Sequence, residues 1–335
     1  MKTRSLLLAL LLAPAAAADE PKRFVFEEPH MGTKFRIVLY AADQVAANAA
    51  AKAAFNRVAE LNRIMSDYDS TSELMRLCLA NANTAGEPVR VSDELFTVLA
   101  QARKVSEKSG GAFDVTVGRL TKLWRLTRKT QKLPDPQELA AARSRVGYKK
   151  MELNAKDKTV RLLTPGMQLD LGGIAKGYAA DEALAVLKKH GISQALVAAG
   201  GDVAVGDAPP GRLGWKIDVA KLTKSSPERA LILANAAVST SGDAEQFALI
   251  DGVRYSHIVD PRTGLGQTGR RVVTVVAKQG IVADPMTKAM ALLTPEQAMR
   301  LIEATDTAAA RIVWEQDGRE EERESRRWKQ YLADW

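Results

Sequence analysis

The sequence predicts an α+β protein rather than a doubly wound α/β fold. Capped helices and short strands both occur, the strands come in runs, and no regular strand-helix-strand unit repeats along the chain. A length of 335 residues suffices for one large domain or two intimately joined ones, and no long low-complexity linker divides it. We therefore expect residues 19–335 to form a single domain of two joined lobes, with the functional site between them.

The first half of the chain opens with a strand and then becomes helical. Alternating residues at 34–40 (KFRIVLY) predict a strand, and Asp43 suits the N-cap of an alanine-rich helix over 43–65. After the loop SDYDSTSEL, residues 92–109 predict a second helix that ends at a pair of glycines. The letters DPQE from residue 135 have capping-box spacing with proline at the first helical position, so a third helix starts there.

The second half mixes strands and helices. Short strands are predicted within 151–171 (MELN, TVRLL, QLDL), before a helix over about 174–190 that a glycine closes. QALVAA, WKIDVA and RALILAN predict further strands, residues 248–259 a hairpin around Asp-Gly, and VVTVVAK a buried strand. Two helices follow, the second opened by TPEQ from residue 294. The charged tail, about 317–335, predicts a solvated C-terminal helix because opposite charges recur at helical spacing.

The first eighteen residues have the composition of a secretory signal peptide. Lys2 and Arg4 give a basic start, an apolar run spans 6–12, and small residues precede Asp19. The run is too short to span a membrane, and no cysteine lies near the cleavage point to carry a lipid anchor. We therefore expect residues 1–18 to be removed and the mature protein to be periplasmic and soluble, without a stable membrane span.

Charge and cysteine content narrow the classes of ligand and chemistry. A net charge of +8 suits an anionic ligand, but only 5% of residues are aromatic and no RNA-binding module occurs, so nucleic acid is not an expected partner. The single cysteine, Cys78, cannot form an internal disulfide. It shares an apolar helical stripe with Leu74 and Leu77, which predicts core packing rather than a nucleophile.

The glycine-rich segment LDLGGIAKGYAAD at 169–181 fits neither the dinucleotide-binding fingerprint nor the Walker A pattern. Asp170 ends a predicted strand, Gly172 and Gly173 permit close backbone approach, and Lys176 lies on the first turn of the next helix. The N-terminus of a helix attracts anions. We therefore expect this segment to be a tight turn and a ligand site at once.

Two further glycine-containing segments are ambiguous when taken alone. SGGAFDVTVG (109–118) is either a helix end followed by a buried phenylalanine or a place where Phe113 stacks on a ring. The Gly-Gly-Asp sequence at 200–202 is either a plain turn or a close approach of backbone to a ligand. For each segment by itself, the structural interpretation is favoured.

Two segments near the C-terminal third carry chemically capable side chains. YSHIVDPRTG (255–264) has good turn chemistry, yet it also holds His257, a proton carrier at neutral pH, and Arg262, whose fork suits phosphate or carboxylate. In IVADPMTKAM (281–290), Asp284 is as well explained by an N-cap before proline as by a metal ligand. Neither segment decides a function alone.

Taken together, eight motifs occur in order along the chain. They are Met31-Gly32-Thr33, Ser66 and Tyr68 with Ser72-Glu73, Gly111-Ala112-Phe113-Asp114, LDLGGIAKGYAAD, Gly200-Gly201-Asp202, Ser239-Thr240-Ser241-Gly242-Asp243, the segment from His257 to Gly264, and Ala283-Asp284. This ordered set resembles the ApbE family, the FAD:protein FMN transferases, over essentially the whole mature chain. The resemblance implies an α+β fold with a mixed or antiparallel sheet related to the tunnelling fold, and a flavin cleft between two lobes.

The resemblance also implies a function and a site. Family members bind FAD and Mg²⁺, transfer FMN from FAD to a threonine hydroxyl of a target protein, and release AMP. The implied partner is an exported acceptor protein, a periplasmic or membrane-attached redox subunit. The implied flavin-binding positions are Met31, Tyr68, Ala112, Phe113, Asp114, Asp170, Lys176 and Ile258. The implied metal positions are the backbone at Gly173 and the side chain of Asp284, with Thr287 and Lys288 beside it.

The chemistry of that reaction suggests roles for the remaining polar residues. An alcohol attacks a phosphorus of a diphosphate, so both phosphates need charge neutralisation, and Mg²⁺ prefers oxygen ligands such as an aspartate and a backbone carbonyl. The threonine has a high pKa, so a general base is useful. We assign His257 to that base or to a phosphate contact, Asp260 to orienting its neighbours, and Arg262 to charge or structure.

One position departs from the pattern of the family. The last motif of the family is Asp-x-x-x-Thr, and the hydroxyl of its threonine also binds the metal. In this chain Lys288 stands four residues after Asp284, and Thr287 comes one position earlier. Residues four apart share a helix face, so Lys288 is placed to pair with Asp284 and to compete with Mg²⁺. Thr287 points about 100° away around the helix. The departure weakens the metal assignment more than the flavin assignment.

Two other functions therefore stay open. The first is a non-catalytic periplasmic protein that binds or delivers FAD without chemistry. Lys288 favours this alternative because it stands where the family has a metal-binding threonine. A pyrophosphatase would let water replace the threonine and split FAD into FMN and AMP. The chain itself lacks an acidic Ser-Gly-Ala-Thr acceptor sequence, so self-modification is not expected.

Overall fold

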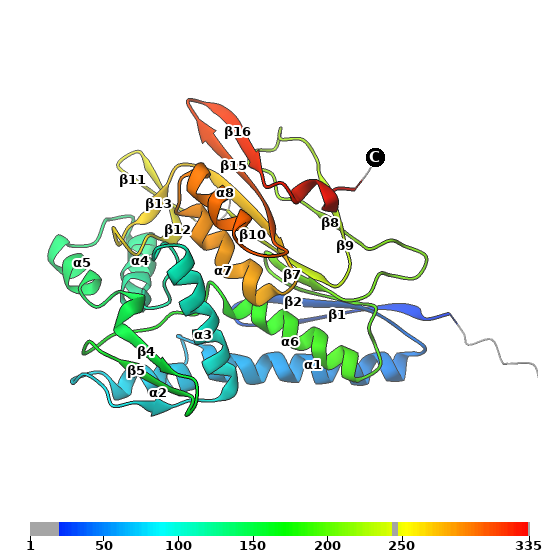
Figure 1. Cartoon of the computed structure of the whole chain (residues 1–335), viewed down its shortest axis with the longest axis horizontal. Helices are drawn as coiled ribbons and strands as arrows, with labels where there is room; N and C mark the ends of the chain where they lie inside the picture. The colour runs from blue at the N-terminus through cyan, green and yellow to red at the C-terminus, as the bar shows by residue number, and fades with distance from the viewer. Residues whose placement is uncertain (1–19, 243–246, 334–335) are drawn as a thin grey trace, which may run out of the picture.

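An eight-stranded sheet forms the centre of the computed structural model, which describes residues 20–242 and 247–333 (Figure 1). Every pair of neighbouring strands in it is antiparallel, so the predicted α+β class is confirmed. The strands lie in the order β1 (Lys22–His30), β2 (Thr33–Ala41), β6 (Ala195–Ala199), β7 (Asp202–Val205), β10 (Ala236–Gly242), β14 (Arg271–Ala277), β15 (Ala309–Gln316) and β16 (Arg319–Glu324). The predicted signal peptide, residues 1–18, and Asp243 lie outside the described residues.

Three helices pack on one face of this sheet and against one another: α1 (Gln44–Met65), α6 (Ala175–Lys189) and α7 (Gly280–Ala291) (Figure 1). On β2, Phe35, Ile37 and Leu39 are fully buried on that side, as the alternation in the sequence predicts. The predicted N-cap of α1 is confirmed, because the Asp43 side chain accepts a hydrogen bond of 2.8 Å from the backbone N–H of Ala46.

The opposite face of the sheet is covered by smaller elements. The hairpin β8 (Trp215–Asp218) and β9 (Ala230–Leu233) packs there with the 3₁₀ helix η2 (Trp328–Tyr331). Trp215 and Trp328 are buried in this second core together with Val38 of β2. Because Val38 alternates with Ile37 and Leu39, β2 contributes to both cores.

Two peripheral layers complete the described chain. One contains α2 (Glu73–Ala80), α3 (Asp93–Lys108), η1 (Tyr148–Lys150), β3 (Val89–Arg90), β4 (Met151–Asn154) and β5 (Thr159–Leu162). The other contains α4 (Gly118–Thr130), α5 (Pro136–Arg143), β11 (Phe247–Ile250), β12 (Val253–Val259) and β13 (Gly266–Thr268). Helix α8 (Pro295–Glu303) follows α7 and has the capping box that its sequence predicts.

Several local predictions are confirmed. Residues 248–259 form the expected hairpin of β11 and β12, and Cys78 is buried in the main core, which raises the pKa of its thiol. Within the described ranges, no helix has the length and apolar character that a membrane crossing requires.

The predicted helix over about 317–335 is wrong. Residues 319–324 form the edge strand β16, and only the short η2 follows within the described residues. The charges pair across strands instead of along a helix: Arg229 contacts Glu322 at 2.9 Å and Glu324 at 2.7 Å, and Arg311 donates to Glu322 at 3.0 Å. Cross-strand partners that are distant in sequence therefore override the local helical spacing of charges.

The structure also contains elements that the sequence did not predict. Strands β1, β7, β10 and β15 of the central sheet and helix α4 were not predicted, and QLDL forms only a single bridge, between Gln168 and Val117, instead of a strand. Asp284 is not an N-cap, because α7 begins at Gly280 and Pro285 lies inside the helix. The cap of α7 comes from another element, since the Asp181 carboxylate accepts from the N–H groups of Gly280 (2.7 Å) and Ile281 (2.9 Å).

Candidate functional site

The glycine-rich segment forms a tight turn that leads directly into helix α6. The backbone N–H of Asp170 donates to the Val115 carbonyl at 2.8 Å, and the Asp170 side chain accepts from the N–H of Gly172 at 2.8 Å. Helix α6 then starts at Ala175, so the Lys176 side chain extends from its first turn and donates to the Gly172 carbonyl at 3.3 Å. The turn and the helix N-terminus thus occur together, as the sequence predicts.

Four charged residues, Lys176, Asp202, Asp284 and Lys288, make a cluster at this turn, here called the lysine-aspartate cluster. Lys176 Nζ lies 3.0 Å from Asp202 Oδ2 and 3.9 Å from Asp284 Oδ2, and Lys288 Nζ contacts Asp284 Oδ1. Asp284 is completely buried, whereas 16% of the Lys288 side chain and 23% of the Lys176 side chain are exposed. The two ammonium groups therefore separate a buried carboxylate from the surface.

Opposite charges in the cluster compensate for the burial of Asp284 and Lys176. Burial opposes ionisation of Asp284, but the ammonium groups of Lys176 and Lys288 and a hydrogen bond from the Gly177 N–H lower its pKa. Burial likewise opposes the charge on Lys176, yet Asp284 and Asp202 raise its pKa above the ordinary value for lysine. Asp202 is also held by Ser239 Oγ at 2.5 Å.

Close contact between α6 and α7 brings the parts of the cluster together. A Cβ on Gly177 would lie 2.3 Å from the carbonyl oxygen of Gly280 and 2.8 Å from Asp284 Cβ. A Cβ on Gly280 would in turn lie 2.4 Å from the carbonyl oxygen of Gly177. Only glycine at both positions permits this approach, and the approach sets Asp284 beside the first turn of α6.

The segment from Ala112 to Asp114 lies beside the cluster, but its side chains point mostly into the protein. Only 6% of Phe113 is exposed. A Cβ on Gly173 would lie 3.2 Å from the Phe113 ring and 3.5 Å from the stem of Lys288, so these three residues are neighbours. The buried Asp114 carboxylate accepts from Thr116 at 2.8 Å and from the Tyr148 N–H at 2.6 Å. Phe113 thus borders the site, whereas Asp114 stabilises the loop and Ala112 is buried.

Arg125, which no sequence motif singled out, links two predicted residues. Arg125 of α4 stacks over the ring of Tyr68 with 4.1 Å from Cζ to the ring centre, and its Nη2 lies 3.2 Å from Asp170 and 2.6 Å from Asp67. Tyr68 is 79% exposed, so the ring face away from Arg125 is open. Burial, and then the charge of Asp170, raise the pKa of Asp67, while Arg125 lowers it.

Met31 lies in the turn between β1 and β2, in the left-handed region with φ of 49°. This turn adjoins the turn of Gly200 and Gly201, because Thr33 Oγ1 lies 3.4 Å from where a Cβ on Gly200 would be. The next residue after those glycines is Asp202 of the lysine-aspartate cluster. The first and fifth motifs are therefore neighbours at one end of the central sheet, where β2 pairs with β6.

The segment from His257 to Gly264 spans a strand and the loop after it. His257 is half-buried on β12, and Ile258 is buried in the main core. Arg262 makes paired contacts to Asp260, the shorter of 2.7 Å, and donates to the Leu292 carbonyl at the end of α7 at 2.6 Å. Asp260 and Arg262 thus hold this loop against α7, which supports the structural role for Arg262.

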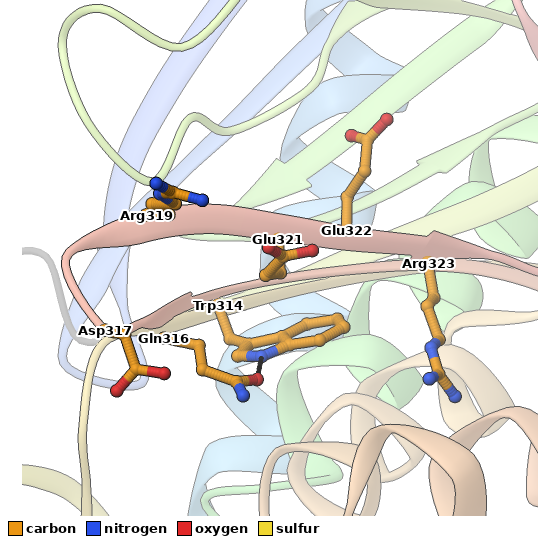
Figure 2. Close-up of a pocket in the computed structure, with 7 residues that line it drawn as sticks. All are labelled: Trp314, Gln316, Asp317, Arg319, Glu321, Glu322 and Arg323. Carbon is orange, nitrogen blue, oxygen red and sulfur yellow. Dashed lines mark hydrogen bonds between the residues drawn. The ribbon is translucent and has the colours of Figure 1, made fainter.

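A separate pocket of about 530 Å³ lies on the hairpin of β15 and β16 (Figure 2). It contains none of the predicted site residues, and Figure 2 shows that its side chains are mostly charged and lie along the two strands with the Trp314 ring among them. Its lining residues are Trp314, Gln316, Asp317, Arg319, Glu321, Glu322 and Arg323. It is therefore not the predicted flavin site.

Comparison with known proteins decides the family. The family model described as "ApbE family" matches residues 31–312, from the turn of Met31 to strand β15. The chain belongs to the ApbE family. A relative named FAD:protein FMN transferase, from Vibrio cholerae, is 31% identical over 317 residues, which cover 93% of each chain. A second of that name, from Treponema pallidum, is 33% identical and covers 81% of this chain and 79% of its own.

Solved structures of ApbE proteins agree with the fold. The flavin transferase ApbE from Vibrio cholerae superposes with a TM-score of 0.83 at 29% identity, covering 93% of this chain and all of the other. The ApbE protein from Thermotoga maritima gives a TM-score of 0.82 at 29% identity, with the same coverage. The predicted family, fold class and enzyme class, a transferase, are confirmed. The relation to the tunnelling fold and the cleft between lobes stay predictions.

The ApbE family implies a magnesium ion, and the donor set at Asp284 does not fit one. Asp284 Oδ1 contacts the Lys288 ammonium, and Oδ2 accepts from the Gly177 N–H at 3.1 Å. An ammonium has no lone pair for a metal, and the Thr287 hydroxyl donates at 2.7 Å to the backbone carbonyl of Asp284. Across residues 20–242 and 247–333, no group of three or more His, Cys, Asp and Glu side chains is arranged to hold a metal.

Three residues that local sequence patterns did not assign hold together the elements that carry the predicted site: Asp67, Arg125 and Asp181. Asp67 directly precedes Tyr68, which was a usable signal. Arg125 lies in a helix that was not predicted, and Asp181 contacts Gly280 from 99 positions earlier in the chain, so local patterns could not reveal either.

Proposed function

We propose that this ApbE protein transfers the FMN part of FAD to a threonine hydroxyl of an exported acceptor protein and releases AMP. The observation that carries the proposal is the coverage of 93% of the chain by a relative named FAD:protein FMN transferase. The lysine-aspartate cluster supports it, because two ammonium groups at a helix N-terminus suit a diphosphate. The proposed compartment is the periplasm, supported by the apolar run and basic start at residues 1–18.

The side chains around the cluster suggest how FAD binds. The open face of Tyr68 suits stacking on the flavin ring, since Arg125 already fixes its other face. Lys176 and Lys288 face the diphosphate and donate hydrogen bonds to its oxygens. Phe113 and the stem of Lys288 pack closely against Gly173, because a Cβ there would lie 3.2 Å from the Phe113 ring and 3.5 Å from the lysine stem.

The transfer step follows from the chemistry of a diphosphate. The threonine oxygen forms a bond to the FMN phosphorus, the bond from that phosphorus to the bridging oxygen breaks, and AMP leaves with the electron pair. The hydroxyl proton passes to a base, for which His257 on β12 is our candidate. Magnesium was expected from the family, but no step here passes through a metal, because the donors at Asp284 do not fit one.

The test uses the mature chain, FAD and a co-occurring redox subunit as acceptor. The expected result is the mass of FMN on one acceptor threonine and an equal amount of AMP. A His257→Asn variant should keep FAD affinity and lose transfer by at least about 100-fold, the usual contribution of a general base. Release of free FMN without acceptor would replace the proposal with a pyrophosphatase. Tight FAD binding without any product would replace it with a delivery protein.

A further inference from the structure

A buried carboxylate with a tethered cation is the central feature of the lysine-aspartate cluster. Asp284 has no exposed side-chain surface, and a charge at such a position is costly unless a partner of opposite sign compensates it. Lys288 supplies that partner from the next turn of the same helix. The compensating charge is thus built into the chain.

Lys288 is placed to contact a ligand as well as Asp284. Its side chain retains 16% exposure, and its stem passes 3.5 Å from the position of a Cβ on Gly173, next to the turn that leads into α6. An ammonium has three N–H donors, and the contact to Asp284 Oδ1 uses one of them. Two donors therefore remain for oxygens of an anion bound at the turn.

The same geometry disfavours a divalent cation. A Mg²⁺ ion at Asp284 would need oxygen ligands in near-octahedral geometry at about 2.1 Å. Lys288 offers no such oxygen, its positive charge repels a second cation, and the Thr287 hydroxyl is directed to the carbonyl of Asp284. The charge balance is already complete, since two lysines face two aspartates.

We propose that the Lys288 ammonium takes the place of a divalent cation at Asp284, so that this chain binds the diphosphate of FAD without a metal. The inference rests on the proposed function for the identity of the ligand. Lys176 assists from the first turn of α6, where it lies 3.0 Å from Asp202 and 3.9 Å from Asp284.

The test measures FAD affinity by quenching of flavin fluorescence, with EDTA and then with Mg²⁺. Wild type should show the same Kd in both conditions, within about twofold. Lys288→Met should weaken FAD binding at least about tenfold in both, the loss expected from one charged contact. Lys288→Thr should be as weak in EDTA and regain affinity when Mg²⁺ is added. The matched control is Lys278→Thr, an exposed lysine just before α7, which should match wild type.

The outcomes separate this inference from the proposed function. Wild-type FAD binding that EDTA abolishes and Mg²⁺ restores would overturn the inference and leave the transferase proposal intact. So would a Lys288→Met variant that binds FAD as tightly as wild type. Metal-free FAD binding that yields no modified acceptor would support the inference and overturn the transferase. Circular dichroism of each variant verifies that it is folded, and Lys288→Arg, which keeps a cation at Asp284, should retain metal-free binding if Lys288→Met unfolds.

Discussion

The guanidinium of Arg125 lies over the ring of Tyr68, with 4.1 Å between Cζ and the ring centre. The same guanidinium contacts Asp67 at 2.6 Å and Asp170 at 3.2 Å. One side chain thus links an exposed aromatic ring to Asp170, at the start of the glycine-rich turn. It connects the part of the site proposed for the flavin ring with the part proposed for the diphosphate.

Replacement of Arg125 by methionine should weaken FAD binding about tenfold. The reason is that Tyr68 loses a cation-π contact worth about 1 kcal/mol and becomes mobile, while Asp67 and Asp170 lose their shared cation. Fluorescence titration with FAD measures the change. Lys129→Met, on the exposed side of the same helix, is the control and should bind normally. Equal Kd values for the two variants would contradict the stacking role of Tyr68.

Gly177→Ala should lower the free energy of unfolding by about 2 kcal/mol. Alanine stabilises a helix by about 1 kcal/mol more than glycine does. However, the new Cβ would lie 2.3 Å from the carbonyl oxygen of Gly280, a backbone atom that cannot move aside as a flexible side chain could. The two helices must separate, which also disturbs the hydrogen bond from Gly177 to Asp284. Urea denaturation measures the loss, with the exposed Ala185→Ser on the same helix as control. A stabilised Gly177→Ala variant would disprove the close packing.

Asp181 should make stability depend on pH in a window between about 4 and 6. Burial raises its pKa to about 6, although the N–H groups of Gly280 and Ile281 oppose the shift. The folded state therefore keeps a proton that the unfolded state releases above its lower, ordinary pKa, so stability falls as pH rises through this window. Asparagine cannot ionise, so the stability of wild type relative to Asp181→Asn should decrease from pH 4 to 6.5 by on the order of 2 kcal/mol.

Denaturation of both proteins at several pH values checks this prediction. The hydrogen bond that the variant loses changes the free energy of unfolding by the same amount at every pH. The test is therefore how the difference between the two proteins changes with pH. Above pH 7 the difference should be constant. If the free energies of unfolding of the two proteins ran parallel over the whole pH range, Asp181 would have the same pKa in the folded and unfolded states.

Trp124→Phe should reduce FMN transfer more than FAD binding. Trp124 Nε1–H donates at 2.9 Å to the carbonyl of Ser256, the residue before His257, and a Cβ on Gly266 would lie 2.4 Å from the indole. Loss of this hydrogen bond should cost about 1 kcal/mol of stability and loosen β12. Single-turnover transfer and FAD titration, compared with Trp314→Phe on the β15 strand, measure the two effects. A loss of FAD affinity alone, with transfer intact at saturating FAD, would argue against positioning of His257.

Local sequence signals predicted much of the fold correctly. Caps such as Asp43 and Thr294 act within three or four residues, so the sequence reveals them without knowledge of the rest of the chain. The prediction of a helix in the charged tail was wrong because contacts with distant segments decide its structure. Its helical charge spacing is a weak local effect, and pairing with β15 and with Arg229 outweighs it.

The sequence by itself determined the family, through eight motifs in order, and the pairing of Lys288 with Asp284, because residues four apart on a helix face the same side. Only the tertiary structure decided that Asp284 is buried inside α7 and that Lys176 reaches it from α6. The same holds for the stacking of Arg125 on Tyr68. These contacts join segments far apart in the chain, and burial, which sets their strength, exists only after the helices and the sheet have packed together.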